Sequence, residues 1–195
     1  TERVTAGTAH VFAQTYTECT NKCTDFTHRI VLVELDEPVR PDLPTAMTPL
    51  ADGAGLAHDL ERNLGVHLKD KRILVLGAGG AVRGVLVPLL KHHPALIAIA
   101  NRTLSKAKDL AGEFAHYGKV EASGFKELKG KHFDVVINGT AASLKGEVPP
   151  LPDNLFTTHA LAYDMMYGEK SKPFLDWAAV HGAMQVVDGL GMLVE

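Results

Sequence analysis

Cysteine is scarce in this sequence. Only Cys19 and Cys23 occur in 195 residues. Two thiols in a chain of this length cannot build the disulfide framework of a small secreted domain, which predicts a reducing, cytoplasmic setting. The pair could bind zinc together with His10 and His28. The loose spacing and the threonine-rich flanks instead favour a chain without a metal site.

A strong net charge, long apolar runs and a signal peptide are lacking as well. The net charge is −3 and the pI is near 6.3, which predicts no nucleic-acid partner and no anionic membrane partner. The apolar run at 95–100 is far too short to span a bilayer. The first ten residues have no basic region followed by an apolar one, so no secretory signal is visible. Hydrophobic residues make up 46% of the chain and charged residues 22%, which is the balance of a soluble globular protein.

Composition changes near residue 50. Before it, residues 29–35 form one strand-like run, and residues 36–50 contain four prolines. Prolines are excluded from helix interiors and central strands, so 36–50 is predicted to be an extended connection. Residues 1–28 receive no assignment. The sequence therefore predicts a short irregular N-terminal segment over residues 1–50, and a separate domain over residues 51–195.

After residue 50, apolar patterns typical of strands and helices alternate. Strands alternating with helices predict a parallel sheet covered on both faces, which is an α/β doubly wound fold of the Rossmann type. Pro88 lies inside one predicted helix as an expected kink. The predicted strands are 72–77, 95–100, 119–123, 134–140, 160–166 and 184–189, and the predicted helices are 55–65, 81–93, 105–118 and 172–182.

A glycine-rich stretch joins the first predicted strand of this domain to its helix. Gly77 allows a tight turn there, and Gly79 lets the backbone approach a pyrophosphate at the helix start. The sixth position is Val82, where the usual dinucleotide motif has glycine or alanine; Gly80 and Ala81 supply small residues instead. The motif predicts a dinucleotide phosphate site, and a purely structural turn is its alternative.

The end of the second predicted strand indicates which dinucleotide is bound. Asn101, Arg102 and Thr103 stand there, with Lys106 one turn further on and no acidic residue before Asp109. A carboxylate at this point would repel a 2′-phosphate, whereas arginine pairs with it. The pattern predicts NADP rather than NAD. Its alternative is a solvated basic helix start, which the helix dipole disfavours unless an anion is present.

Three further motifs complete a resemblance to a known family. They are "ADGAGLAHDLER" at 51–62, "YDMMYGEKSKPFLDWA" at 163–178 and "DGLGMLV" at 188–194. Together with the two cofactor loops they resemble shikimate dehydrogenase over about residues 51–195. The chain is most similar to the NADP-dependent biosynthetic branch, because related quinate-using enzymes that prefer NAD tend to carry an acid where Arg102 stands.

The resemblance implies reduction of 3-dehydroshikimate to shikimate by hydride transfer from NADPH, in chorismate and aromatic amino-acid biosynthesis. In the family, a Lys–Asp pair in the cleft moves the proton at the carbonyl oxygen. Asp52 matches that aspartate as a catalytic and substrate-binding residue, although Leu50 and Ala51 replace the Asn and Thr that precede it in the family. The alternative for Asp52 is a helix cap or a turn before Gly53.

The resemblance also implies roles for four other residues. Met165 and Gly189 would lie against the nicotinamide, and Thr140 would line the cofactor cleft. Tyr167 would offer its hydroxyl to the substrate. Core filling is the alternative for Met165, and an exposed turn position is the alternative for Tyr167.

Other parts of the family pattern are missing. Neither the Ser-x-Ser motif nor the Val-Pro-Phe-Lys motif with the catalytic lysine occurs, and the surroundings of Lys22 do not resemble the latter. Glu195 ends the chain where family members continue. We therefore expect the cofactor-binding half of the enzyme. Three functions stay open: an incomplete shikimate dehydrogenase, a non-catalytic NADP-binding module, or a reductase of another carbonyl. An uncovered apolar surface near Tyr167 would favour a homo-oligomer.

Overall fold

The chain divides into two compact units, Thr1–Thr45 and Ala46–Glu195. The computed structural model describes residues 2–6, 9–16, 28–35 and 48–194, with side chains for residues 53–143 and 145–193. The zinc alternative involves Cys19 and Cys23, which lie outside the described residues, as does Lys22.

The first unit contains three antiparallel strands in the order β1-β2-β3. Their bounds are Glu2–Ala6, Ala9–Tyr16 and His28–Leu35. The strand predicted at 29–35 is present as β3, and Val33 pairs with Val11 of β2. The expectation of an irregular segment needs correction for β1 and β2. No element was expected over residues 1–28, although β1 and β2 form a hairpin in which Ala6 pairs with Ala9. The pairing of β2 with β3 joins positions further apart, such as Ala9 and Leu35.

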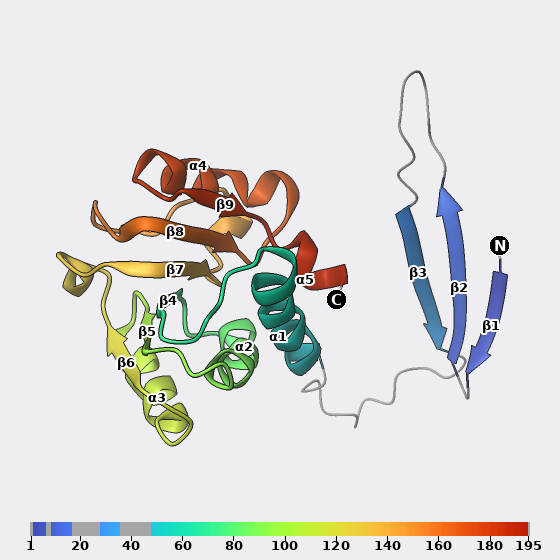
Figure 1. Cartoon of the computed structure of the whole chain (residues 1–195), viewed down its shortest axis with the longest axis horizontal. Coiled ribbons are helices and arrows are strands. Elements are labelled where there is room, and N and C mark those ends of the chain that lie inside the picture. Colours follow the sequence, from blue (N-terminus) through green and yellow to red (C-terminus); the bar gives the residue numbers. More distant parts are fainter. Residues whose placement is uncertain (1, 7–8, 17–27, 36–47, 195) are drawn as a thin grey trace. The chain divides into compact units, whose positions relative to one another are not determined.

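The second unit is built on a six-stranded parallel sheet in the order β6-β5-β4-β7-β8-β9 (Figure 1). This order places β4 next to both β5 and β7, as in doubly wound nucleotide-binding folds. The predicted fold class is confirmed. The strands are β4 Arg72–Leu76, β5 Leu96–Ala100, β6 Val120–Ser123, β7 Phe133–Asn138, β8 Phe156–Asp164 and β9 Gln185–Val187.

Helices cover both faces of the sheet (Figure 1). One face packs with side chains of α1, α2, α3 and α5, and the other packs with α4 and the turn η3. The helices are α1 Thr48–His58, α2 Gly80–Leu90, α3 Leu104–Phe114, α4 Lys172–Val180 and α5 Leu190–Val194, and the short turns are η2 Asp59–Asn63, η3 Lys126–Leu128, η4 Ser143–Lys145 and η5 Gly168–Lys170.

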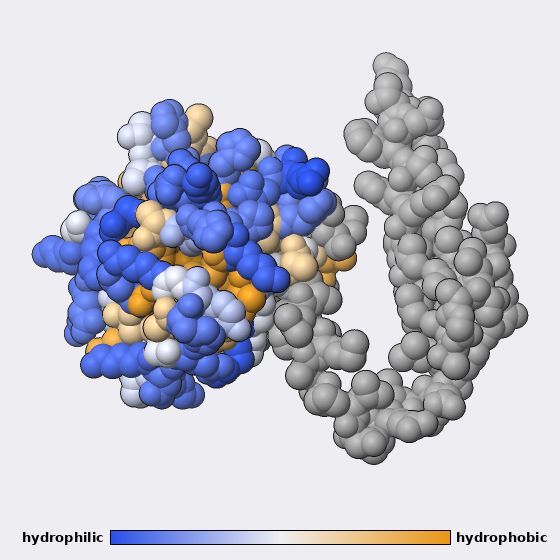
Figure 2. All heavy atoms as spheres, turned by 60° about the horizontal axis from the view of Figure 1, so that its bottom comes forward, coloured by the Kyte–Doolittle hydropathy of each residue, from blue (hydrophilic) through white to orange (hydrophobic). Residues whose placement is uncertain are grey.

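Burial on both faces explains the continuous apolar strands. Ile73 and Val75 of β4 join the core beneath α1, α2 and α3, whereas Leu74 and Leu76 join the core beneath α4. A strand with two buried faces needs apolar residues at every position, not alternate ones. Figure 2 shows one outer face of the molecule, where hydrophilic residues cover most of the surface and surround a central strip of apolar residues.

Helix α1 begins earlier than the sequence pattern indicated. It starts at Thr48 and contains Pro49 and Asp52, so the extended connection predicted over 36–50 is wrong for its last three residues. Proline is compatible with the first turn of a helix, where its missing N–H would have no intrahelical partner. The π-helical turn that follows ends at Asn63, and Gly65, two residues later, has a φ of +65°, a left-handed conformation typical of a glycine just beyond a helix end.

Helix α2 is continuous through Pro88 and ends at Leu90, three residues before the predicted end at 93. Within the described residues, none of the helices combines the length and the apolar character that a membrane crossing requires.

Close packing of α1 on α2 depends on glycine. A Cβ atom built on Gly53 would lie 2.2 Å from the carbonyl oxygen of Gly84 and 3.0 Å from the ring of Pro88. Both neighbours belong to a helix with a buried apolar face, so neither can move away without disturbing the core.

We predict that Gly53→Ala lowers the free energy of unfolding by about 1–3 kcal/mol, because the added methyl overpacks this helix contact. Gly112→Ala is the matched control, since Gly112 also lies in a helix but has no atom within 4 Å of its Cβ position. We expect the control to raise stability by up to about 1 kcal/mol. Urea unfolding followed by circular dichroism measures both, and equal effects would contradict the packing argument.

Candidate functional site

A cleft lies at the carboxyl ends of β4, β5 and β7. At this point the strand order reverses, since β5 and β6 lie on one side of β4 and β7 to β9 lie on the other. The volume of the cleft is about 470 Å³. Ligands of open α/β sheets bind at this kind of switch point, because the loops after neighbouring strands diverge there. The residues that line the cleft are Gly77 to Ala81, Asn101 to Thr103, Lys106, Phe125, Gly139 to Ala142, Lys145 and Glu147 to Pro150.

The glycine loop forms the floor of this cleft. Gly77 has a φ of +106°, and a Cβ there would lie 2.9 Å from the carbonyl oxygen of Gly139, so both backbone strain and close approach require glycine. Gly79 and Gly80 have no atom within 4 Å of their Cβ positions. Gly79 caps α2 without a side-chain hydrogen bond, which leaves the first-turn amides available to an anion.

A basic corner follows β5. The side-chain amide of Asn101 donates to the backbone oxygen of Thr103 over 3.0 Å, which shapes the turn before α3. Arg102 and Lys106 are exposed, and neither forms an ion pair with another described residue. The first turn of α3 contains no acidic residue. Two unpartnered cations at a helix start favour a bound anion.

Buried hydrogen bonds connect the ends of β7 and β8. Asn138 donates to Asp164 over 2.9 Å and to Ser143 over 2.8 Å, and Ser143 donates to Asp164 over 2.8 Å. All three side chains are at most 1% exposed. Thr140 donates to the side-chain oxygen of Asn138 through both its amide and its hydroxyl. These bonds hold the loop after β7 against the sheet.

The Asp164 carboxyl has an altered affinity for protons. Burial raises its pKa, and the nearby charge of Asp188 acts in the same direction. Hydrogen bonds from the Met166 amide, Ser143 and Asn138 oppose the shift because they stabilise the charged form. The net effect is a raised pKa.

A second buried hydrogen bond fastens α5 to the start of η2. The Tyr163 hydroxyl donates to Asp59 over 2.8 Å and accepts from the amide of Met192 over 3.3 Å. Burial raises the pKa of Tyr163, and the hydrogen bond to Asp59 raises it further. A Cβ on Gly191 would lie 2.3 Å from the Asp59 carboxylate, so glycine permits this contact.

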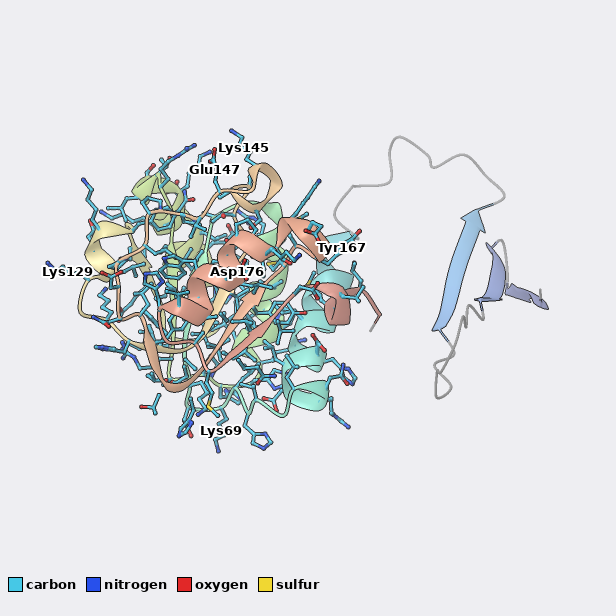
Figure 3. The ribbon with its side chains drawn as sticks, turned by 90° about the horizontal axis from the view of Figure 1, so that it is seen from above. Lys69, Lys129, Lys145, Glu147, Tyr167 and Asp176 are labelled. Atoms are coloured by element: carbon cyan, nitrogen blue, oxygen red, sulfur yellow. The ribbon has the colours of Figure 1, made fainter. Side chains whose placement is uncertain are left out.

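Met165 packs against one residue of the cleft wall, and Gly189 packs against Met165. A Cβ on Gly189 would approach the backbone oxygen of Met165 to 2.5 Å, and one on Gly139 would approach the Met165 sulfur to 3.0 Å. Gly139 lines the cleft, so Met165 packs directly behind that wall. Tyr167 is 52% exposed and lies at a different edge of the domain from Lys145 and Glu147 (Figure 3).

The cleft brings together most of the residues singled out from sequence, which are Gly77, Gly79, Gly80, Ala81, Asn101, Arg102, Thr103, Lys106 and Thr140. Met165 lies directly behind Gly139 of the cleft wall, Gly189 packs on Met165, and neither these two residues nor Tyr167 lines the cleft. Asp52 lies in α1, but its side chain is outside the described ones. Sequence reasoning missed Phe125, Lys145 and Glu147. Their only available signal was a position in loops that follow strands of a predicted parallel sheet.

Comparison with known proteins agrees with this geometry. Residues 59–145 match the family model of shikimate/quinate 5-dehydrogenases. A shikimate dehydrogenase (NADP(+)) from Cellvibrio japonicus is 60% identical over 143 residues, which are 73% of this chain and 51% of that protein. The resemblance predicted from the motifs is confirmed. The chain spans about half the length of the curated relatives it matches.

Solved structures show the same fold. An Ael1 enzyme from Pseudomonas putida is 45% identical with a TM-score of 0.69, and the match covers 74% of this chain and 53% of that one. A shikimate dehydrogenase solved in complex with NADP+ is 32% identical with a TM-score of 0.59, covering 74% of this chain and 52% of that one.

We predict that the stability difference between the parent chain and Asp164→Asn shrinks as pH rises from about 4 to 7. A raised pKa means that the folded state holds this proton more tightly than the unfolded state. The contribution of Asp164 to stability therefore falls as pH rises from the unfolded pKa, about 3.9, through the folded one. Asparagine cannot ionise, so the variant lacks this slope and only a constant offset from the lost acceptor remains.

Urea titrations at several pH values measure this difference. Each unit of pKa shift corresponds to about 1.4 kcal/mol. Asp176→Asn, which changes an exposed carboxylate on α4 (Figure 3), is the control. If the stability difference stays constant or grows with pH, burial does not raise the pKa of the Asp164 carboxyl.

Proposed function

We propose that this chain binds NADP(H) in the cleft and provides the cofactor-binding part of a shikimate dehydrogenase. The observation that carries the proposal is the meeting of the open glycine loop with Arg102 and Lys106 in one cleft. The match of residues 59–145 to the family supports the choice of reaction. A cytoplasmic location and self-association stay predictions.

The residues present fit this dinucleotide. Absence of side chains at Gly79 and Gly80 leaves room for a pyrophosphate beside the amides of α2. At the end of β5, Asn101 stands where NAD-binding folds carry an acid, and Arg102 offers a planar donor to a 2′-phosphate. Lys106 adds a second positive charge at the same corner.

Residues beside the cleft would orient the reacting groups. The bound cofactor would supply the hydride, which adds to the carbonyl carbon while the carbonyl oxygen receives a proton. Thr140, Met165 and Gly189 would set the position of the nicotinamide. Asp52 would hold a proton near the substrate oxygen, and Tyr167 would donate its hydroxyl to the substrate, both by analogy with the family.

Two measurements on one sample test the proposal. Fluorescence of NADPH reports binding, and absorbance at the nicotinamide band reports oxidation of shikimate or of quinate with NADP+. We expect binding. Oxidation of shikimate would support shikimate dehydrogenase activity. Binding of NADPH without oxidation of shikimate would support a non-catalytic cofactor-binding module. Failure to bind NADPH would overturn both functions.

We predict that Arg102→Asp costs more affinity for NADP+ than for NAD+, by about 1.5–3 kcal/mol, because charge-assisted bonds to the 2′-phosphate are lost. Lys108→Asp makes a similar charge change on α3 at a position that does not line the cleft. This variant controls for the effect of the changed net charge of the domain on the binding of an anionic cofactor. Calorimetric titration of both cofactors gives the difference, and equal losses would argue against a 2′-phosphate at Arg102.

We also predict that Gly79→Val weakens binding of NADP+ and NAD+ alike by more than about tenfold. The valine side chain would project into the space that the pyrophosphate requires. Gly79 has a φ of −92° and a ψ of −175°, which any residue adopts, so the fold is retained. Gly112→Val is the control, because Gly112 is equally open but lies away from the cleft. A Gly79 variant with normal affinity would place the phosphates elsewhere.

A further inference from the structure

The loop after β7 forms a wall of the cleft on the far side of the glycine loop from the basic corner, because β4 lies between β5 and β7 in the sheet. Gly139 to Ala142, Lys145 and Glu147 to Pro150 all line it. Val148 and Leu151 pack against the core cluster that contains Ala100 at the end of β5 and Phe125. This packing holds the loop against the sheet.

Backbone hydrogen bonds fix the position of Lys145 on this wall. The amides of Lys145 and Glu147 both donate to the carbonyl of Ala142, over 2.9 and 3.0 Å. Gly146 ends the turn with a φ of +68°, a conformation that favours glycine. Ser143, two residues before Lys145, is held in the buried hydrogen bonds to Asn138 and Asp164. The lysine backbone therefore has little freedom, while its side chain is exposed.

The charges that line the cleft are unbalanced. Arg102, Lys106 and Lys145 oppose a single carboxylate, that of Glu147, among the described lining residues. None of the three cations forms an ion pair or a side-chain hydrogen bond with another described residue. Figure 3 shows Lys145 and Glu147 at the same end of the domain, away from Lys69 and Lys129. Unpaired cations gathered in one cleft raise the local concentration of an anionic ligand.

We propose that Lys145 is a third phosphate-binding cation, which acts on the dinucleotide from the wall opposite Arg102 and Lys106, and that Glu147 limits its effect. The inference rests on the proposed function, since it concerns the same ligand. Lys145 strengthens the binding of NADP+ more than that of NAD+, because the additional phosphate carries additional charge. Its attraction is screened by salt, since the side chain stands in solvent.

The test compares dissociation constants of NADP+ and NAD+ for the parent chain, Lys145→Gln and Lys145→Arg. Exposed charge pairs contribute modestly, so we expect Lys145→Gln to weaken NADP+ binding about two- to fivefold at low ionic strength. Lys145→Arg retains the charge and stays close to the parent. At about 500 mM salt, where the Debye length falls below about 5 Å, the difference between parent and Lys145→Gln disappears.

Two further variants sharpen the result. Glu147→Gln removes the opposing charge, and we expect it to tighten NADP+ binding at low salt. Lys129→Gln removes an exposed lysine that does not line the cleft, and it should leave the dissociation constants unchanged. Because Lys145, Glu147 and Lys129 are all exposed, melting temperatures should stay equal among the variants.

The outcomes separate this inference from the function on which it rests. If the parent chain fails to bind NADP+, the proposed function is wrong and the role of Lys145 falls with it. If the parent binds and Lys145→Gln behaves like Lys129→Gln at low salt, the inference is overturned while the proposed function stands. A loss that persists unchanged at high salt would also overturn it, since it would show a structural effect of the residue.

Discussion

The hydrogen bonds among Asn138, Ser143 and Asp164 hold the cleft in shape. A buried carboxylate is unfavourable by itself, and it is retained here because three donors meet it: two side chains and the Met166 amide. Each bond to a charged acceptor is worth about 1.5–3 kcal/mol. Through Ser143 the carboxylate fixes the loop that lines the cleft, and through Met166 it fixes the turn that bears Met165. One buried charge thus positions both the wall of the cleft and the residue packed behind it.

Buried contacts and exposed charges have different roles in this site. Rigidity comes from buried contacts, which are the bonds to Asp164, the Tyr163–Asp59 bond and the close approach of Gly77 to Gly139. In the proposed function, recognition comes from exposed cations. A single exposed charge pair contributes up to about 1 kcal/mol, and charge-assisted hydrogen bonds such as those proposed for Arg102 contribute more. The exposed groups therefore gain their effect by acting together on a multiply charged ligand. Such a site would distinguish ligands by their number of phosphate groups, and its affinity would depend on ionic strength.

Cofactor binding and substrate chemistry are separable in this chain. The described residues supply a glycine loop, a basic corner and a walled cleft, while the chain spans about half the length of its curated relatives. Hydride transfer requires a bound dinucleotide and a proton donor held over the same carbonyl. The glycine loop and the basic corner of the cleft are the groups proposed to bind the dinucleotide. Asp52 and Tyr167 are the residues proposed for the second requirement, and Tyr167 stands at an exposed edge outside the cleft.

Local patterns in the sequence determined the parallel strands, the phosphate loop and the basic residues after β5, because buried strands need continuous apolar runs and a phosphate turn needs glycine. They did not determine β1, β2 or the early start of α1, whose stability comes from pairing and packing with other segments. Nor did they indicate Phe125, Lys145 or the bond from Asn138 to Asp164. Asn138, Lys145 and Asp164 come together because β7 pairs with β4 on one side and β8 on the other, and Phe125 reaches the cleft because β6 pairs with β5. Strand order is a property of the whole sheet, so only the tertiary structure decided which distant loops face each other across the cleft.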